Sequence, residues 1–322
     1  MNRCGITAYQ PPVTPDIFEG THNAVHNGFG IGGVHVHFSG ECEADVRLFP
    51  PVNLFRVEER KFDIDIQIEW VNRIPEPLGR KTFDAGNTWR LFDNGDGFQF
   101  DFNSEALGSR PYRRLFIDGE FSIAKLQLSE ECFAQLPSVP ESLGYPLDEL
   151  LIMHRLTQER AIELHGSGIV CANGVANLFV GHSGAGKSTT TRLWTSREEV
   201  EVLSDDRIIV RYDDGRDGPV GPSGMRMYGT PWHGEAMFAS PNSAPLTRVF
   251  ILEHGHGNVI TRLSRSQAVG ELFARAFVPF HRHEYVEAGL SFLEELAGAV
   301  PCYRYCFEPD ERAVEKIQQF ND

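Results

Sequence analysis

Alternation of apolar and polar residues with a period of two marks the first half of the chain. The clearest run covers residues 62–70, where every second residue is apolar. These apolar residues share one face of the predicted strand: Phe62, Ile64, Ile66, Ile68 and Trp70. Residues 89–102 and 113–128 each contain two strand-like runs around a glycine-containing turn, which predicts two β-hairpins. We therefore expect residues 26–145 to form a β-rich N-terminal domain with an antiparallel sheet, after an irregular arm over residues 1–25.

The pattern changes after a corner at residues 137–146, which contains prolines and a glycine. Residues 147–156 have the spacing of an amphipathic helix, and Pro146 stands where a helix can begin. Further along, short apolar runs alternate with helical ones. We expect strands at residues 162–164, 168–171, 177–181, 200–204, 208–212, 246–253 and 302–307, and helices at residues 189–194, 266–277, 284–299 and 310–320. This order predicts an α/β domain over residues 146–322 and an α+β fold overall.

Charge and composition narrow the classes of partner. The chain has 322 residues and a net charge of −15, which argues against nucleic acid or an anionic membrane surface as the main partner. No segment approaches the ~20 apolar residues of a membrane span, and the first residues lack the apolar stretch of a secretory signal. Six cysteines without a Cys-x-x-Cys pair favour reduced thiols. We expect a cytoplasmic protein.

Residues 181–188 read Gly-His-Ser-Gly-Ala-Gly-Lys-Ser and meet the phosphate-loop pattern Gly-x4-Gly-Lys-[Ser/Thr] at every position. A predicted strand enters the loop and a predicted helix leaves it, so backbone N–H groups and the helix dipole would favour phosphate. Lys187 would reach the β- and γ-phosphates, and the Ser188 hydroxyl would bind Mg²⁺. The sequence therefore predicts ATP and Mg²⁺ as cofactors. The predicted contacting residues are Gly181, His182, Ser183, Gly184, Ala185, Gly186, Lys187, Ser188 and Thr189.

Two adjacent carboxylates follow the phosphate loop closely. Asp205 and Asp206 stand at the end of a predicted strand, the first of them eighteen positions after Lys187. A carboxylate in this place can hold Mg²⁺ directly or through water. The second can accept the proton of a substrate hydroxyl during phosphoryl transfer. The alternative is that one of them caps a turn and the other faces solvent.

Three segments together resemble the kinase domain of HPr kinase/phosphorylase: Glu-Leu-His-Gly-Ser-Gly-Ile-Val at residues 163–170, the phosphate loop, and Leu-Ser-Asp-Asp at residues 203–206. The resemblance implies a fold similar to the nucleotide domain of phosphoenolpyruvate carboxykinases. It implies phosphate and metal binding by Lys187 and Ser188, a metal-side role for Asp205 and a general-base role for Asp206. It also puts His165 near the transferred phosphate. The two aspartate roles can be exchanged.

The chain also departs from this family. The Gly-x-Gly-x-Ile-x-Val signature is replaced by Tyr-Gly-Thr-Pro-Trp-His-Gly-Glu at residues 228–235, and the N-terminal half does not resemble the family's regulatory domain. The resemblance therefore does not extend to HPr as substrate or to the reverse phosphorylase reaction. The chain looks more like HPr-kinase-related proteins found near peptide-modification genes. Candidate acceptor-side residues are Arg226, Gly229, Trp232, His233 and Glu235.

Other residue types carry weaker expectations. Arg207, Arg226 and Arg275 are candidates to neutralise transition-state charge, although each also fits a surface ion pair. His165 by itself also fits a core histidine, and Trp232 a turn anchor. Residues 280–284, Phe-His-Arg-His-Glu, form a cationic cluster that would suit an anionic substrate or simply a solvated helix start.

The leading hypothesis is an ATP-dependent kinase that phosphorylates a Ser/Thr-type hydroxyl on a peptide, a protein or a small molecule. The alternative is a non-catalytic or weakly hydrolytic nucleotide-binding module whose N-terminal domain binds a partner peptide through an edge strand. A carboxykinase-like enzyme ranks last, because its substrate residues are not identifiable. Members of the resembling family often form homo-oligomers, and the sequence leaves this open.

Overall fold

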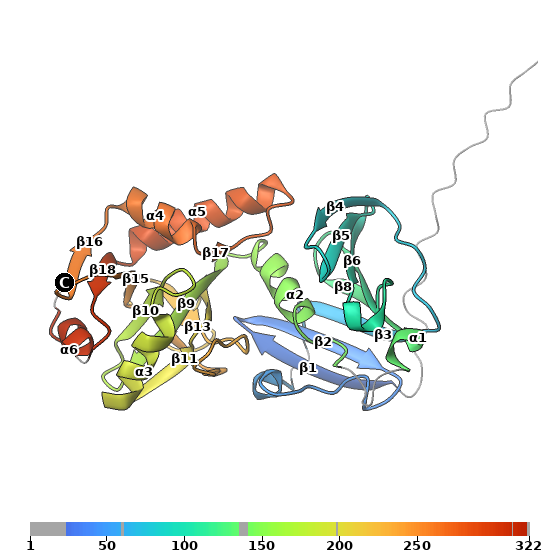
Figure 1. Ribbon diagram of the computed structural model, residues 1–322, viewed down its shortest axis with the longest axis horizontal. Helices are drawn as coiled ribbons and strands as arrows, with labels where there is room; N and C mark the ends of the chain where they lie inside the picture. The colour runs from blue at the N-terminus through green and yellow to red at the C-terminus, as the bar shows by residue number, and fades with distance from the viewer. Residues whose placement is uncertain (1–23, 59–60, 135–140, 198, 311, 321–322) are drawn as a thin grey trace, which may run out of the picture.

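The computed structural model describes residues 24–58, 61–134, 141–197, 199–310 and 312–320. Its mixed α/β architecture consists of two mixed β-sheets, with helix α2 lying between them (Figure 1). Most of the predicted N-terminal arm lies outside the described residues. The arm also ends earlier than expected, because Val25 already belongs to strand β1.

Eight strands form the N-terminal sheet, in the order β1-β2-β3-β8-β7-β6-β5-β4. Both predicted hairpins are confirmed, as β5–β6 and β7–β8. The expected antiparallel pairing holds for β1–β2 and from β4 to β8, but β3 runs parallel to both of its neighbours, β2 and β8. Parallel neighbours need a longer connection than a hairpin turn, and residues 41–63 supply one between β2 and β3. The strands are β1 (Val25–Ile31), β2 (Val34–Gly40), β3 (Ile64–Val71), β4 (Arg80–Asp84), β5 (Trp89–Asp93), β6 (Gly97–Phe102), β7 (Arg113–Asp118) and β8 (Ile123–Ser129).

The ten-stranded C-terminal sheet is centred on strand β9 (Ala161–Cys171), which pairs with β10, β11, β12 and β17. Two separate strands were expected here, and the structure has one. Gly166 and Gly168 interrupt the apolar pattern but not the strand, because β9 stays paired with β10 across both positions. Glycine suits residue 168, where a Cβ would lie 2.8 Å from Ile208 Cδ1. The other strands are β10 (Ala176–Val180), β11 (Val200–Ser204), β12 (Arg207–Tyr212), β13 (Met225–Tyr228), β14 (Ser243–Pro245), β15 (Arg248–His254), β16 (Val259–Arg262), β17 (Ala276–Phe277) and β18 (Cys302–Phe307).

The C-terminal half also contains four helices: α3 (Lys187–Arg197), α4 (Arg265–Phe273), α5 (His283–Ala299) and α6 (Arg312–Gln318). Helix α4 is shorter than expected. It ends at Phe273 because Ala276 and Phe277 pair with β9 as strand β17. A short helix α1 (Glu130–Phe133) follows the N-terminal sheet, and a 3-10 helix (Val52–Phe55) precedes β3. Across the segments that the structure describes, no helix is both long and apolar enough to cross a membrane.

Helix α2 (Leu147–Leu156) belongs to the apolar core of the N-terminal sheet. The predicted boundary between residues 145 and 146 falls just before it. Its side chains Leu147, Leu151 and Ile152 are at most 1% exposed and join the same core as the inner face of β3. Residues from the C-terminal half, including Ile209 and Trp232, complete this core. The two sheets therefore share buried apolar surface around α2.

A buried ion pair within the N-terminal sheet supplies a test of the fold. Arg114 Nε donates to Asp101 Oδ1 at 2.6 Å, and both side chains are at most 2% exposed. Replacing Arg114 with methionine leaves the Asp101 charge buried without its partner. We expect the free energy of unfolding, measured in urea, to fall by about 3–5 kcal/mol.

The matched control is Arg73→Met, which removes an exposed pair with Glu131. This change should leave the urea midpoint close to that of the wild type, because exposed ion pairs contribute little to stability. Equal losses in the two variants would contradict the importance of the buried pair.

Candidate functional site

The phosphate-loop residues connect strand β10 to helix α3, as the sequence predicts. Gly184 and Gly186 have φ angles of +78° and +97°, which side chains rarely adopt. A Cβ on Gly181 would lie 2.7 Å from the Ala185 Cβ, so the tight turn also needs glycine there. Ser188 and Thr189 stand half-buried in the first turn of α3. The loop and the start of an eleven-residue helix therefore form a backbone suited to bind an anion.

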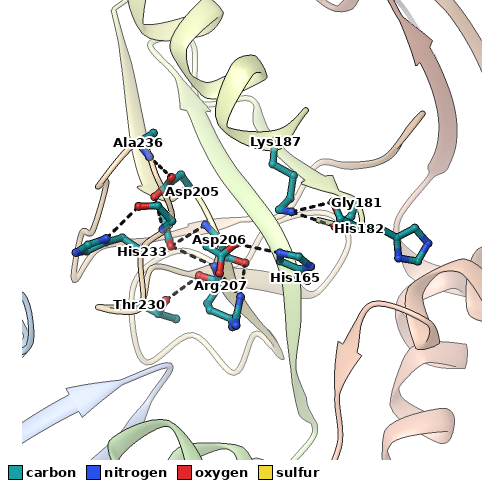
Figure 2. Close-up of polar contacts among 12 residues, drawn as sticks. His165, Gly181, His182, Lys187, Asp205, Asp206, Arg207, Thr230, His233 and Ala236 are labelled. Carbon is teal, nitrogen blue, oxygen red and sulfur yellow. Dashed lines mark hydrogen bonds and ion pairs between the residues drawn. The ribbon is translucent and has the colours of Figure 1, made fainter. Parts of the chain in front are cut away.

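Lys187 lies under this loop and is 6% exposed. Its Nζ donates to the carbonyl oxygens of Gly181 and His182, at 3.1 and 3.2 Å (Figure 2). Burial lowers the pKa of Lys187, while the nearby Asp206 charge acts in the opposite direction. The two hydrogen bonds of the ammonium group thus go to carbonyl oxygens of the loop, and phosphate oxygens would be stronger acceptors.

Asp206 and His165 meet because β12 pairs with β9, with Arg207 opposite His165. His165 Nε2 lies 2.9 Å from Asp206 Oδ1, and Arg207 donates to Asp206 Oδ2 (Figure 2). Burial acts to raise the pKa of Asp206. The His165 hydrogen bond and the Arg207 charge outweigh it, so the pKa lies below its ordinary value. Asp206 is therefore an ionised carboxylate at neutral pH that faces Lys187.

Asp205 points the other way and is fully buried. Its Oδ1 accepts the N–H groups of Gly234 and Phe238 at 3.0 and 3.2 Å, and its Oδ2 accepts that of Ala236 at 2.8 Å. All three donors belong to the loop that follows strand β13. Both oxygens are thus engaged with backbone, which leaves Asp206 as the aspartate that faces the phosphate loop. Of the two assignments left open by the sequence, this geometry disfavours Asp205 as a metal ligand.

The loop at residues 229–238 is anchored at several points. A Cβ on Gly229 would lie 2.0 Å from the Ser240 carbonyl oxygen, so this position requires glycine. Trp232 is 8% exposed and its Nε1 donates to Asp148 Oδ2, on helix α2, at 2.8 Å. Trp232 is therefore a turn anchor. His233 is half-buried and Glu235 is exposed, and they flank Gly234, which packs against both aspartates.

The three candidate arginines have different surroundings. Arg226 is buried on β13, where it pairs with Asp213 at 3.1 Å, so it does not join the site. Arg275 pairs with Glu271 at 2.7 Å, and its charge contributes to the lowered pKa of Lys187. Arg275 therefore remains near the phosphate loop, while Arg207 contacts Asp206 directly.

Two residues of the cluster at 280–284, His281 and Arg282, pack against Phe98 of the N-terminal sheet. Arg282 lies over the Phe98 ring at 4.5 Å, and burial lowers the pKa of His281 to about 4. His281 is therefore neutral at physiological pH. The expected cationic surface for an anionic substrate is correspondingly reduced.

Four residues near the site were not singled out from the sequence: Asp148, Glu149, Glu163 and His254. Asp148 and Glu149 lie in an amphipathic helix, where acidic residues usually face solvent. Glu163 lies among apolar residues in the buried strand β9. His254 Nε2 lies 2.8 Å from the Gly184 carbonyl oxygen, and its ring stacks on Phe307. Its position at the end of β15, beside β10, follows only from the strand order.

Within the described ranges, no group of three or more His, Cys, Asp or Glu side chains could hold a metal ion by itself. Mg²⁺ commonly takes one or two protein ligands and completes its shell with phosphates and water. Ser188 and Asp206 are the residues that could supply such ligands here. No family model matches the chain, and no curated protein matches it. The resemblance to HPr kinase/phosphorylase therefore rests on the sequence motifs alone.

His254 offers a first test of the loop. His254 contacts the Gly184 carbonyl oxygen, and the N–H of the same peptide plane, that of Ala185, donates to the His182 carbonyl oxygen at 3.0 Å. Both contacts hold the loop conformation that would bind a phosphate. We expect His254→Ala to weaken MgATP binding about fivefold to tenfold, close to the energy of one hydrogen bond. Fluorescence titration with a labelled nucleotide measures this. The control is His256→Ala, a fully exposed histidine paired with Glu308, which should bind as the wild type does.

Asp148 offers a test by pH. Burial raises the pKa of Asp148 to about 7, and the Trp232 hydrogen bond only partly offsets this. The folded protein therefore holds a proton that the unfolded chain has released, so stability falls as pH rises from about 4 towards 7. The fall is at most about 1.4 kcal/mol for each pH unit.

Asn at position 148 keeps an acceptor for Trp232 but does not titrate. Between pH 5 and 7.5, we expect the urea midpoint of Asp148→Asn to fall less than that of the wild type. Parallel curves for the two proteins would show that Asp148 does not titrate in this range.

Proposed function

We propose that this protein is an ATP-dependent kinase that phosphorylates a hydroxyl group. The observation that carries the proposal is the placement of Asp206, whose carboxylate contacts His165 and Arg207 and whose pKa these contacts and the Lys187 charge lower. A phosphate loop alone fits many nucleotide-binding proteins. A site-facing carboxylate beside it is what phosphoryl transfer to a hydroxyl requires.

The loop amides and the start of α3 would hold the phosphate chain, with Lys187 against the β- and γ-phosphates. Ser188 would supply a protein ligand of Mg²⁺, and phosphate oxygens and water would complete its shell. When bound, MgATP supplies the γ-phosphoryl group and neutralises part of its charge. We also propose an HPr-kinase-like arrangement for residues 146–322, on the motifs at residues 163–170, 181–188 and 203–206.

Asp206 would accept the proton of the acceptor hydroxyl. The acceptor oxygen then forms its bond to the γ-phosphorus as the bond to the β-phosphate oxygen breaks, and the proton resides on Asp206. His165 orients the carboxylate through its 2.9 Å contact. Asp205 would act indirectly, since it holds the loop at residues 229–238 beside Asp206. His233 and Glu235 on this loop are the nearest candidates to contact a peptide, protein or small-molecule acceptor.

One observation favours the alternative, a nucleotide-binding module without transfer. Both oxygens of Asp206 already have partners, His165 and Arg207, so a hydroxyl has to compete with these contacts for the carboxylate. In that case MgATP would bind, phosphate would be released slowly or not at all, and no phosphorylated acceptor would form.

The deciding experiment is ³¹P spectroscopy of the protein with MgATP and candidate hydroxyl acceptors. We expect a new phosphate ester with the wild-type protein. Asp206→Asn should reduce its formation at least 100-fold, because the amide cannot accept the proton, while MgATP affinity stays within a few-fold. Lys187→Ala is the binding control and should lose MgATP affinity itself. Transfer by Asp206→Asn at the wild-type rate would refute the base assignment.

A further inference from the structure

Arg207 is the side chain through which helix α2 reaches the candidate site. Its Nε lies 2.9 Å from Glu149 Oε1, on α2, and 3.5 Å from Glu163 Oε1, on β9. On its other side, a terminal nitrogen donates to Asp206 Oδ2. The guanidinium also lies over the Phe277 ring of β17, with Cζ 4.1 Å from the ring centroid. Contacts from three elements thus fix the direction from which Arg207 meets Asp206.

Glu149 and Glu163 form a buried acidic pair beside this guanidinium. Glu163 is fully buried, and neither of its carboxyl oxygens accepts a hydrogen bond within the described part of the chain. Burial first, and the charge of Glu149 second, hold the pKa of Glu163 well above its ordinary range. Glu163 therefore keeps its proton at neutral pH. The pair then carries one negative charge, which lies beside the positively charged guanidinium of Arg207.

We propose that the Glu149–Glu163 pair positions Arg207, and through it Asp206, so that helix α2 is part of the catalytic support. Without the Glu149 charge, Asp206 is the remaining negatively charged partner of Arg207. The guanidinium would then move onto Asp206 and occupy the carboxylate that has to receive the hydroxyl proton. The kinetic consequence rests on the proposed kinase function, whereas the coupling between these side chains does not.

The position of α2 is itself set by the N-terminal sheet. Leu147 and Leu151 are buried in the core of that sheet, and Asp148, next to Glu149, binds the Trp232 indole of the acceptor-side loop. One turn of α2 therefore contacts both sides of the site: Asp206 through Arg207, and the loop at residues 229–238 through Trp232. This gives the N-terminal region a defined role in the geometry of the C-terminal one.

The first experiment tests the coupling without any activity. Glu149→Gln and Asp206→Asn are combined in a double-mutant cycle, and urea midpoints are measured for all four proteins. We expect the two effects to be non-additive, since Arg207 contacts both side chains. The same cycle in an Arg207→Gln background should be additive. Additivity in both backgrounds would overturn the proposal, whether or not the protein is a kinase.

The second experiment measures turnover of MgATP, with water as the acceptor where no other acceptor is available. Glu149→Gln should reduce kcat about 10- to 100-fold through misplacement of Asp206. Its MgATP dissociation constant should stay within twofold of the wild-type value.

The matched control is Glu159→Gln, which removes a similar ion pair with Arg211 on the same strand, β12, but away from Asp206. This variant should lose stability and keep its kcat. Equal losses of kcat in the two variants, or an unchanged kcat in Glu149→Gln, would overturn the positioning role. Absence of turnover in the wild-type protein, with candidate hydroxyl acceptors as well as with water, would instead refute the proposed function, and the double-mutant cycle alone would then decide the coupling.

Discussion

The pairing of β9 with its neighbours is the constraint on which the candidate site depends. β10 leads into the phosphate loop, β11 leads to the two aspartates, and β12 starts at Arg207. All three strands are hydrogen-bonded to β9, so these chain segments are brought to His165 by main-chain register. A one-residue slip of β12 against β9 would turn its side chains to the opposite face and separate Asp206 from His165.

Charge at the site is balanced by burial and pairing. Lys187, Asp206 and Arg207 alternate in sign, and each shifts the pKa of a neighbour. Burial acts to lower the pKa of Arg207, but the charges of Glu149 and Asp206 outweigh it, so the pKa lies above its ordinary value. The cation is therefore permanent. Such a set of charges is expensive to bury, and it is tolerated because each member has at least one partner of opposite sign.

Much of the local structure follows from the sequence. Residues 62–70 alternate strictly because one face of β3 is buried, and the phosphate loop needs its glycines for conformational reasons. The parallel placement of β3 could not be predicted, because strand order depends on which distant strands pair. Arg226 is the clearest error on the site. As an arginine it was a candidate to neutralise transition-state charge, but in the structure it is buried and paired with Asp213. Likewise, no periodicity reveals that Glu149 and Glu163 would meet Arg207.

Helix α2 has a consequence for how this protein can vary. It follows the N-terminal sheet in sequence, is buried in that sheet's core, and touches two groups beside the phosphate loop. A cut at residue 146 would leave Leu147 and Leu151 facing water. The two halves are thus not exchangeable parts. A different N-terminal region could replace this one only if it offered the same apolar surface for α2 to pack against. The unit that can be inherited intact, or transferred to another context, is the pair of sheets together.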